Sequence, residues 1–132
     1  MGKTNYSFRN RLYEALKSSP LAAEITGKVC RGYRDTGSES EDIVFYDFGA
    51  DNASIQGSFV VLNIYVPDIH NGTEWREDAD RCELLAQMAW DFLDELHLGD
   101  YYVEIKEQTS FAVEDENVKQ HGIRFNLNVK QF

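Results

Sequence analysis

The chain has 132 residues, which corresponds to about one domain of typical length and leaves no room for two. Apolar residues make up 42% and aromatic residues 13%, too many for an intrinsically disordered acidic chain. The formal net charge is −10, so the chain repels phosphate and specific nucleic-acid binding is not expected.

The sequence contains no segment typical of secretion or membrane insertion. Its first residues lack the apolar stretch of a secretory signal, and its apolar runs stay far below the roughly 20 residues of a membrane-spanning helix. We therefore expect a cytosolic protein that does not contact a membrane. Its two cysteines, Cys30 and Cys82, form no CxxC pair. Two free thiols in a reducing compartment are favoured, and a disulfide between them is the alternative.

The beginning of the chain predicts two helical segments. Phe8, Leu12 and Leu16 recur at helical spacing, which predicts an amphipathic helix over residues 5–18. The following segment, Pro20–Thr26, has proline at a first-turn position and a glycine just beyond its end, so we expect one or two further helical turns there.

The next part of the chain predicts strands separated by polar loops. We expect a short strand over residues 28–33 and a mobile, polar loop over residues 35–42. Residues 43–48 are rich in β-branched and aromatic side chains and predict a strand. After a turn between residues 51 and 57, residues 58–66 are apolar on both faces and predict an interior strand that ends at a proline.

A long helix is predicted over residues 74–98, with Thr73 as its cap and Gly99 as its C-terminal signal. Leu84, Met88 and Phe92 continue the apolar surface around this helix, so that it covers roughly 240° instead of the usual hundred or so. Either an N-terminal segment of the same chain covers this flank, or the three side chains contact a neighbouring subunit. The expected core stripe consists of Trp75, Ala79, Cys82, Ala86, Ala89 and Leu93.

The end of the chain predicts a strand meander. Residues 101–108 and 123–129 both alternate between apolar and polar side chains, residues 111–113 extend the first strand or form a short one, and residues 114–117 form a turn. The order of elements predicts one α+β domain over residues 1–132. We expect a mainly antiparallel sheet of about five strands, with the N-terminal helix and the long helix packed on it.

The residue types that carry chemistry form no recognisable constellation. The histidines stand beside no cysteine and in no HExxH spacing, so no metal site is expected. No phosphate-binding, dinucleotide-binding or nucleophile-elbow motif is present, so we expect no cofactor and no catalytic residue. The three histidines are His70, His97 and His121.

Two acidic clusters and one carboxylate–imidazole pair are the remaining groups of residue types that can bind ions or carry out catalysis. The clusters around Glu41 and Asp42 and around Asp115 lack EF-hand spacing, so we expect solvated loop charges. Asp68 precedes His70 by two residues, a spacing that would allow the carboxylate to orient the imidazole as in a hydrolase dyad. Loop surface residues are the favoured interpretation of this pair.

Two stretches of the chain have a characteristic order of elements. In LYEALKSSPLAAEITGKV (residues 12–29), a helix ends in a proline- and alanine-containing phrase that leads into a strand. In QGSFVVLNIYVPD (residues 56–68), a strand runs into a loop and then into an acid-rich helix with alanines. Both stretches resemble tail-terminator and tail-completion proteins of long-tailed bacteriophages. The resemblance covers about residues 8–98 and departs from the family at the loop 35–42 and in the long segment 111–116.

The resemblance implies a non-enzymatic virion assembly protein. Such proteins form a ring, often of six subunits, at the head-proximal end of the tail tube, where they end tube growth and present a docking surface to the head. It therefore implies self-association and contacts with tail-tube and head-completion proteins, in the bacterial cytoplasm during assembly and in the virion tail afterwards. On this interpretation, strand edges and the long helix form the ring, with Leu84, Met88 and Phe92 as the candidate interface.

Two other classes of protein are kept as alternatives. A small-ligand or regulatory binding module of bacterial origin would need an enclosed apolar pocket of about 300 Å³ or more with converging polar groups. A small hydrolase would need Asp68 and His70 to converge in a cleft.

Overall fold

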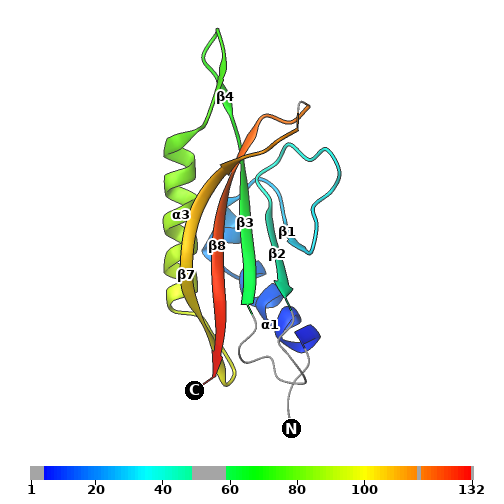
Figure 1. Ribbon diagram of the computed structural model, residues 1–132, viewed down its shortest axis with the longest axis vertical. Coiled ribbons are helices and arrows are strands. Elements are labelled where there is room, and N and C mark those ends of the chain that lie inside the picture. Colours follow the sequence, from blue (N-terminus) through cyan, green and yellow to red (C-terminus); the bar gives the residue numbers. More distant parts are fainter. Residues whose placement is uncertain (1–4, 49–58, 116, 132) are drawn as a thin grey trace.

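A six-stranded sheet with the strand order β1-β2-β3-β8-β7-β6 runs through the molecule, as the computed structural model shows (Figure 1). The structure describes residues 5–48, 59–115 and 117–131. The helices are α1 (Asn5–Lys17), α2 (Pro20–Glu24) and α3 (Ala79–Asp94). The strands of the sheet are β1 (Val29–Arg31), β2 (Ile43–Phe48), β3 (Phe59–Pro67), β6 (His97–Leu98), β7 (Tyr101–Ala112) and β8 (Gln120–Gln131).

The predicted α+β class is confirmed. All strand pairs of the sheet are antiparallel except β1 with β2. The sheet has six strands instead of about five because the two-residue strand β6 pairs with the start of β7. The turn predicted between residues 51 and 57 lies outside the described residues.

The helices bury apolar side chains against one face of the sheet in a single core. In α1, the buried residues Phe8, Leu12 and Leu16 lie four apart and form the stripe that the sequence predicts. The hydroxyl of Ser19 caps α2 by accepting a hydrogen bond from the Ala22 amide at 3.2 Å. No helix among the described residues is long and apolar enough to cross a membrane.

The long helix is shorter than the sequence predicts. α3 begins at Ala79, where the carboxylate of Asp78 accepts a hydrogen bond from the Arg81 amide at 3.3 Å, so Asp78 and not Thr73 is the cap. Gly99, with φ of +64°, lies in the tight turn between β6 and β7 and does not end the helix. The predicted core stripe is also wrong at its start, because the buried face of α3 consists of Leu85, Ala89 and Leu93.

Residues 69–76 form a separate hairpin of β4 (Ile69–His70) and β5 (Trp75–Arg76). This hairpin projects beyond the end of the sheet at the top of Figure 1. Trp75, predicted as a core residue, is therefore 52% exposed.

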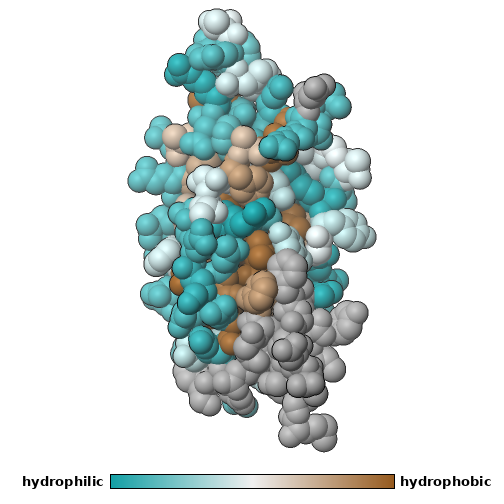
Figure 2. All heavy atoms as spheres, in the orientation of Figure 1, coloured by the Kyte–Doolittle hydropathy of each residue, from teal (hydrophilic) through white to brown (hydrophobic). Residues whose placement is uncertain are grey.

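The interior position predicted for the third strand is confirmed. β3 lies between β2 and β8. Leu62 and Ile64 are fully buried on the helix-covered face, and Asn63 between them is buried on the outer face, where its carbonyl accepts a hydrogen bond from Arg124 Nε at 3.0 Å. Figure 2 views this outer face and shows hydrophobic residues along its middle with hydrophilic residues on both sides.

A β-bulge at Lys106 divides β7 into two halves. Before it, Tyr101 and Val103 are buried and point toward the helices. The register with β8 shifts between Ile105 and Glu107, and this extra residue reverses the alternation of side chains. Phe111 consequently lies on the outer face, where its ring packs over Gly122 and contacts the Tyr65 ring edge-on at 6.0 Å.

The loop over residues 35–42 is folded against the sheet, so the prediction of a mobile loop with solvated charges is wrong for its last residues. Glu41 and Asp42 are 5% and 3% exposed. The Arg34 guanidinium donates to Asp42 Oδ2 through Nε at 3.1 Å and Nη2 at 2.9 Å, and to Gln120 Oε1 of β8 at 2.6 Å. Burial raises the pKa of Asp42, but hydrogen bonds from Ser38, the Lys28 amide and Arg34, together with the arginine charge, lower it further than burial raises it.

Glu41 connects this loop to the helical layer. Its carboxylate accepts hydrogen bonds from Arg81 of α3 at 2.6 and 2.7 Å and from the Thr26 amide at 3.2 Å. Arg81 also donates to the carboxylate of Glu24 at 2.6 Å. The hydrogen bonds to Glu41 and Glu24 raise the pKa of Arg81, which keeps its charge at any accessible pH. Two adjacent carboxylates thus bind two arginines from different parts of the chain.

Candidate functional site

The flank of α3 that carries the predicted interface residues lies beside α2. α2 packs against α3, and the two helices border a groove of about 630 Å³. Met88 and Phe92 are partly buried and line this groove, whereas Leu84 lies outside it and is 45% exposed. The segment from Pro20 therefore covers this flank only in part, and apolar surface remains accessible.

The groove has apolar walls and an acidic rim. Pro20 and Leu21 of α2 face Met88, Phe92 and Leu96 across it. Asp91 and Glu95, both exposed, lie on its border together with His97. The groove is open to solvent instead of enclosed, so it is not the closed pocket that a small-ligand module was expected to have.

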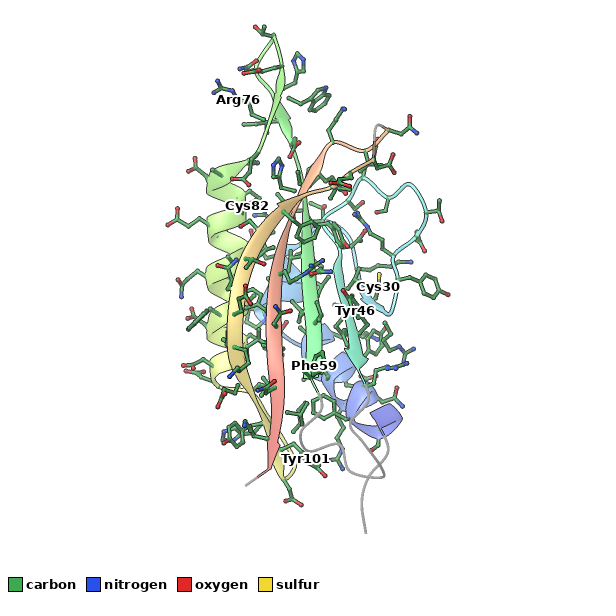
Figure 3. All side chains as sticks on the ribbon, in the orientation of Figure 1. Cys30, Tyr46, Phe59, Arg76, Cys82 and Tyr101 are labelled. Carbon is green, nitrogen blue, oxygen red and sulfur yellow. The ribbon has the colours of Figure 1, made fainter. Side chains whose placement is uncertain are left out.

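The β4–β5 hairpin is the second surface with exposed apolar side chains. Ile69 is 51% exposed and Trp75 is 52% exposed. In the register of the hairpin, Ile69 pairs with Arg76 and His70 pairs with Trp75, so each pair presents one face of the ribbon. The rings of His70 and Trp75 contact edge-on with centroids 5.1 Å apart. Figure 3 shows Arg76 at the projecting end of the molecule, far from Tyr101 at the other end of the sheet.

Hydrogen bonds within the hairpin fix its tip. The side-chain oxygen of Asn71 accepts hydrogen bonds from the amides of Thr73 and Glu74, both at 2.9 Å. The Gly72 amide donates to His70 Nδ1 at 3.0 Å, and Gly72 has φ of +96°, which glycine adopts without strain. The sequence contained a signal for this hairpin, since Asn-Gly is a strong turn pair.

The dyad of Asp68 and His70, the less favoured interpretation, does not form. His70 is an exposed surface residue as expected, but the expectation is wrong for Asp68, whose side chain is 9% exposed. The Asp68 carboxylate lies 2.6 Å from Nδ1 of His121 on β8, while His70 points into the hairpin turn. His121 Nε2 lies 3.9 Å from the carboxylate of Glu77. The imidazole is therefore held between two carboxylates from the segments on either side of the hairpin, and it connects the base of the hairpin to the sheet.

The thiol of Cys82 on α3, which is influenced by the carboxylates of Glu77 and Asp68, is not activated as a nucleophile. Burial, followed by the negative charges of Glu77, Asp78, Asp68 and Glu41, raises the pKa of Cys82 to about 11. A reactive thiol would need a lowered pKa, because the thiolate is the nucleophile. Cys30 and Cys82 are both free thiols, the arrangement that the sequence favours over a disulfide. Figure 3 labels Cys82 beside α3 and Cys30 near β1.

Among the described residues, no group of three or more His, Cys, Asp or Glu side chains is placed to hold a metal ion. Across the same residues, every buried side-chain nitrogen or oxygen has a hydrogen-bond partner. No protein-family model matches the chain, and no curated protein matches it. The groove and the hairpin, which expose apolar side chains, are the candidate functional surfaces.

Proposed function

We propose that this chain is a non-enzymatic virion assembly protein, a tail-terminator or tail-completion factor of a phage or prophage, whose copies associate into a ring at the head-proximal end of the tail. The sequence resemblance over about residues 8–98 supplies the class. The structural observation that supports self-association is the incompletely covered flank of α3, where Leu84, Met88 and Phe92 remain accessible beside the groove.

A strand edge offers further surface for association. β6 pairs only with Tyr101 and Tyr102, and beyond them β7 has no second partner strand among the described residues. An unpaired edge binds other strands through its backbone, whereas a bulge and charges limit such pairing. Lys106 and its charged neighbours protect the middle of β7, so residues 108–112 are the part of this edge that suits a specific contact.

The charge of the chain suits a position beside the path of the genome. A net charge of −10 gives a wall that does not attract DNA phosphates. DNA would then pass through the ring without being held.

The test is the mass of the assembly in solution. Light scattering after size exclusion, on the chain alone and mixed with the tail-tube protein encoded beside it, is expected to show a closed oligomer or a complex. Leu84→Lys places a charge on the apolar flank and is expected to weaken association, whereas Tyr33→Lys makes the same kind of change at an 81% exposed side chain away from the groove and is the matched control. A chain that stays monomeric at all concentrations and never binds the tube protein would overturn the proposal.

A further inference from the structure

We infer that the β4–β5 hairpin of one copy inserts into the α2–α3 groove of the next copy, with Trp75 as the anchoring side chain. This inference rests on the proposed self-association and names the surfaces that carry it. The two surfaces are unlike, so the contact is heterologous, with the hairpin of each copy engaging the groove of its neighbour.

The position of the two surfaces requires a second molecule. In Figure 1 the hairpin projects at the upper end, whereas the C-terminal half of α3, which borders the groove, lies toward the lower end. A hairpin held at one end cannot reach a groove at the other end of its own chain. A hairpin that fills this groove must therefore come from a second copy.

The apolar parts of the two surfaces complement each other. A two-stranded hairpin gains little stability by itself in water, and this one exposes about half of Ile69 and of Trp75. The groove, of about 630 Å³, offers accessible apolar surface from Pro20, Met88 and Phe92. Because Ile69 and Trp75 lie on opposite faces of the ribbon, an inserted hairpin would contact both walls of the groove at once.

The charges complement each other as well. Because the net charge is −10, self-association is favoured where an exposed cation of one copy meets the acidic surface of another. Arg76 follows Trp75 directly and, among the described residues, forms an ion pair with Glu74 at 3.2 Å that is more than half exposed on both sides. Such a pair is weak, so Arg76 can exchange Glu74 for Asp91 or Glu95 on the rim of the groove.

The tip is also ordered before binding, which lowers the entropic cost of association. Asn71 and His70 fix the turn through side-chain hydrogen bonds to Thr73, Glu74 and Gly72. Anchors of this kind, an aromatic side chain beside an arginine on a rigid support, typically dominate binding energies.

The experiment uses two variants of the full chain that each disable one surface. Trp75→Ala removes the anchor and leaves the groove intact, and Met88→Glu places a charge in the groove and leaves the hairpin intact. Each variant alone is expected to associate at least about 30-fold more weakly than the unaltered chain, the loss typical of a hot-spot residue. An equimolar mixture is expected to form a heterodimer and to stop there, because it retains one functional hairpin and one functional groove.

Controls separate this contact from loss of folding and from failure of the proposed function. Tyr33→Ala removes an aromatic side chain that is 81% exposed at another site and is expected to leave association unchanged. Circular dichroism verifies that each variant is folded, and a Met88→Glu variant that fails to fold is replaced by Glu95→Arg on the exposed rim. If Trp75→Ala assembles like the unaltered chain, or if the mixture stays monomeric, the inference is wrong while ring formation stands. If the unaltered chain associates neither with itself nor with the tail-tube protein, the proposed function itself fails.

Discussion

Replacing Asp42 by asparagine tests whether the buried ion pair under the 35–42 loop holds the fold together. The substitution keeps the size of the side chain and removes its charge. The carboxylate, 4% exposed, accepts four hydrogen bonds, from the Lys28 amide at 3.0 Å, the Ser38 hydroxyl at 2.6 Å and two nitrogens of Arg34 at 3.1 and 2.9 Å. Whichever way the asparagine amide is turned, its NH₂ group faces at least one of these donors.

The expected loss of stability is about 3 kcal/mol. Removing one partner of a buried ion pair costs about 3–5 kcal/mol, because the other charge stays buried. The lower end applies here because Arg34 keeps its hydrogen bonds to Gln120 and to the carbonyls of Ser38 and Ser40. Urea unfolding followed by circular dichroism at pH 7 measures the difference in the free energy of unfolding. Glu39→Gln, the same change on an exposed residue of the same loop, is the matched control and should cost less than about 0.5 kcal/mol.

The pH dependence gives a second check of the same reasoning. The pKa of Asp42 is lowered in the folded state from its ordinary value of 3.8. Its contribution to stability is therefore fully present above that value and is lost as the pH falls through the folded pKa. The penalty of Asp42→Asn should shrink on acidification below about pH 4. A penalty below about 1 kcal/mol at pH 7, or one that does not change with pH, would refute the assignment.

Three further substitutions or reactions test the packing. Gly122→Ala places a methyl group against the ring of Phe111 and should lower the free energy of unfolding by about 1–3 kcal/mol, measured by urea unfolding. Adding Phe111→Leu should recover part of the loss. Equal stability of Gly122→Ala and the unaltered chain would contradict the contact. The pKa of Cys82 is about 11 instead of 9.0, so its thiolate fraction at pH 8 is lower in the folded chain. Cys82 should therefore react with Ellman's reagent at pH 8 at least about tenfold more slowly in the folded than in the unfolded chain. Equal rates would show an accessible, unperturbed thiol. Leu93 is 1% exposed, and Leu93→Ala should lower the free energy of unfolding by about 2–5 kcal/mol. Leu84→Ala, on the accessible flank, should lower it by less than about 1 kcal/mol. Similar losses for the two variants would mean that Leu84 is part of the core.

The elements with one strong periodic pattern could be predicted from the sequence. The stripe of α1 and the alternation of β8 determine which side chains face the core, because burial of apolar surface dominates their placement. The start of α3 could not be settled in the same way. Thr73 followed by acidic residues fits a helix start as well as Asp78 does, and the choice depends on the Asn71 side chain, whose bonds to the Thr73 and Glu74 amides close a turn instead.

Features that depend on distant parts of the chain were not predictable. Glu41 appears in the sequence as one of several loop acids, and its burial depends on Arg81, 40 residues later. The sequence suggests His70 as the partner of Asp68 because it is two residues away, whereas the actual partner His121 is 53 residues away and lies beside Asp68 because β3 pairs with β8. The bulge at Lys106 was equally unpredictable from local sequence, because it depends on the register with β8. This one unpaired residue reverses which face of the sheet each later side chain of β7 points to.

The neighbouring carboxylates of Glu41 and Asp42 have a consequence for any assembly built from this chain. One is bound by α3 and the other by the loop that lies against the sheet, so the helical layer cannot shift without exposing a buried charge. The groove beside α3 is thus tied to the sheet, and the hairpin at the end of β3 is tied to the same sheet through the contact of Asp68 with His121. The rotation between neighbouring copies would then depend on how the groove and the hairpin are placed within each molecule, and this rotation would determine the number of copies in a closed ring.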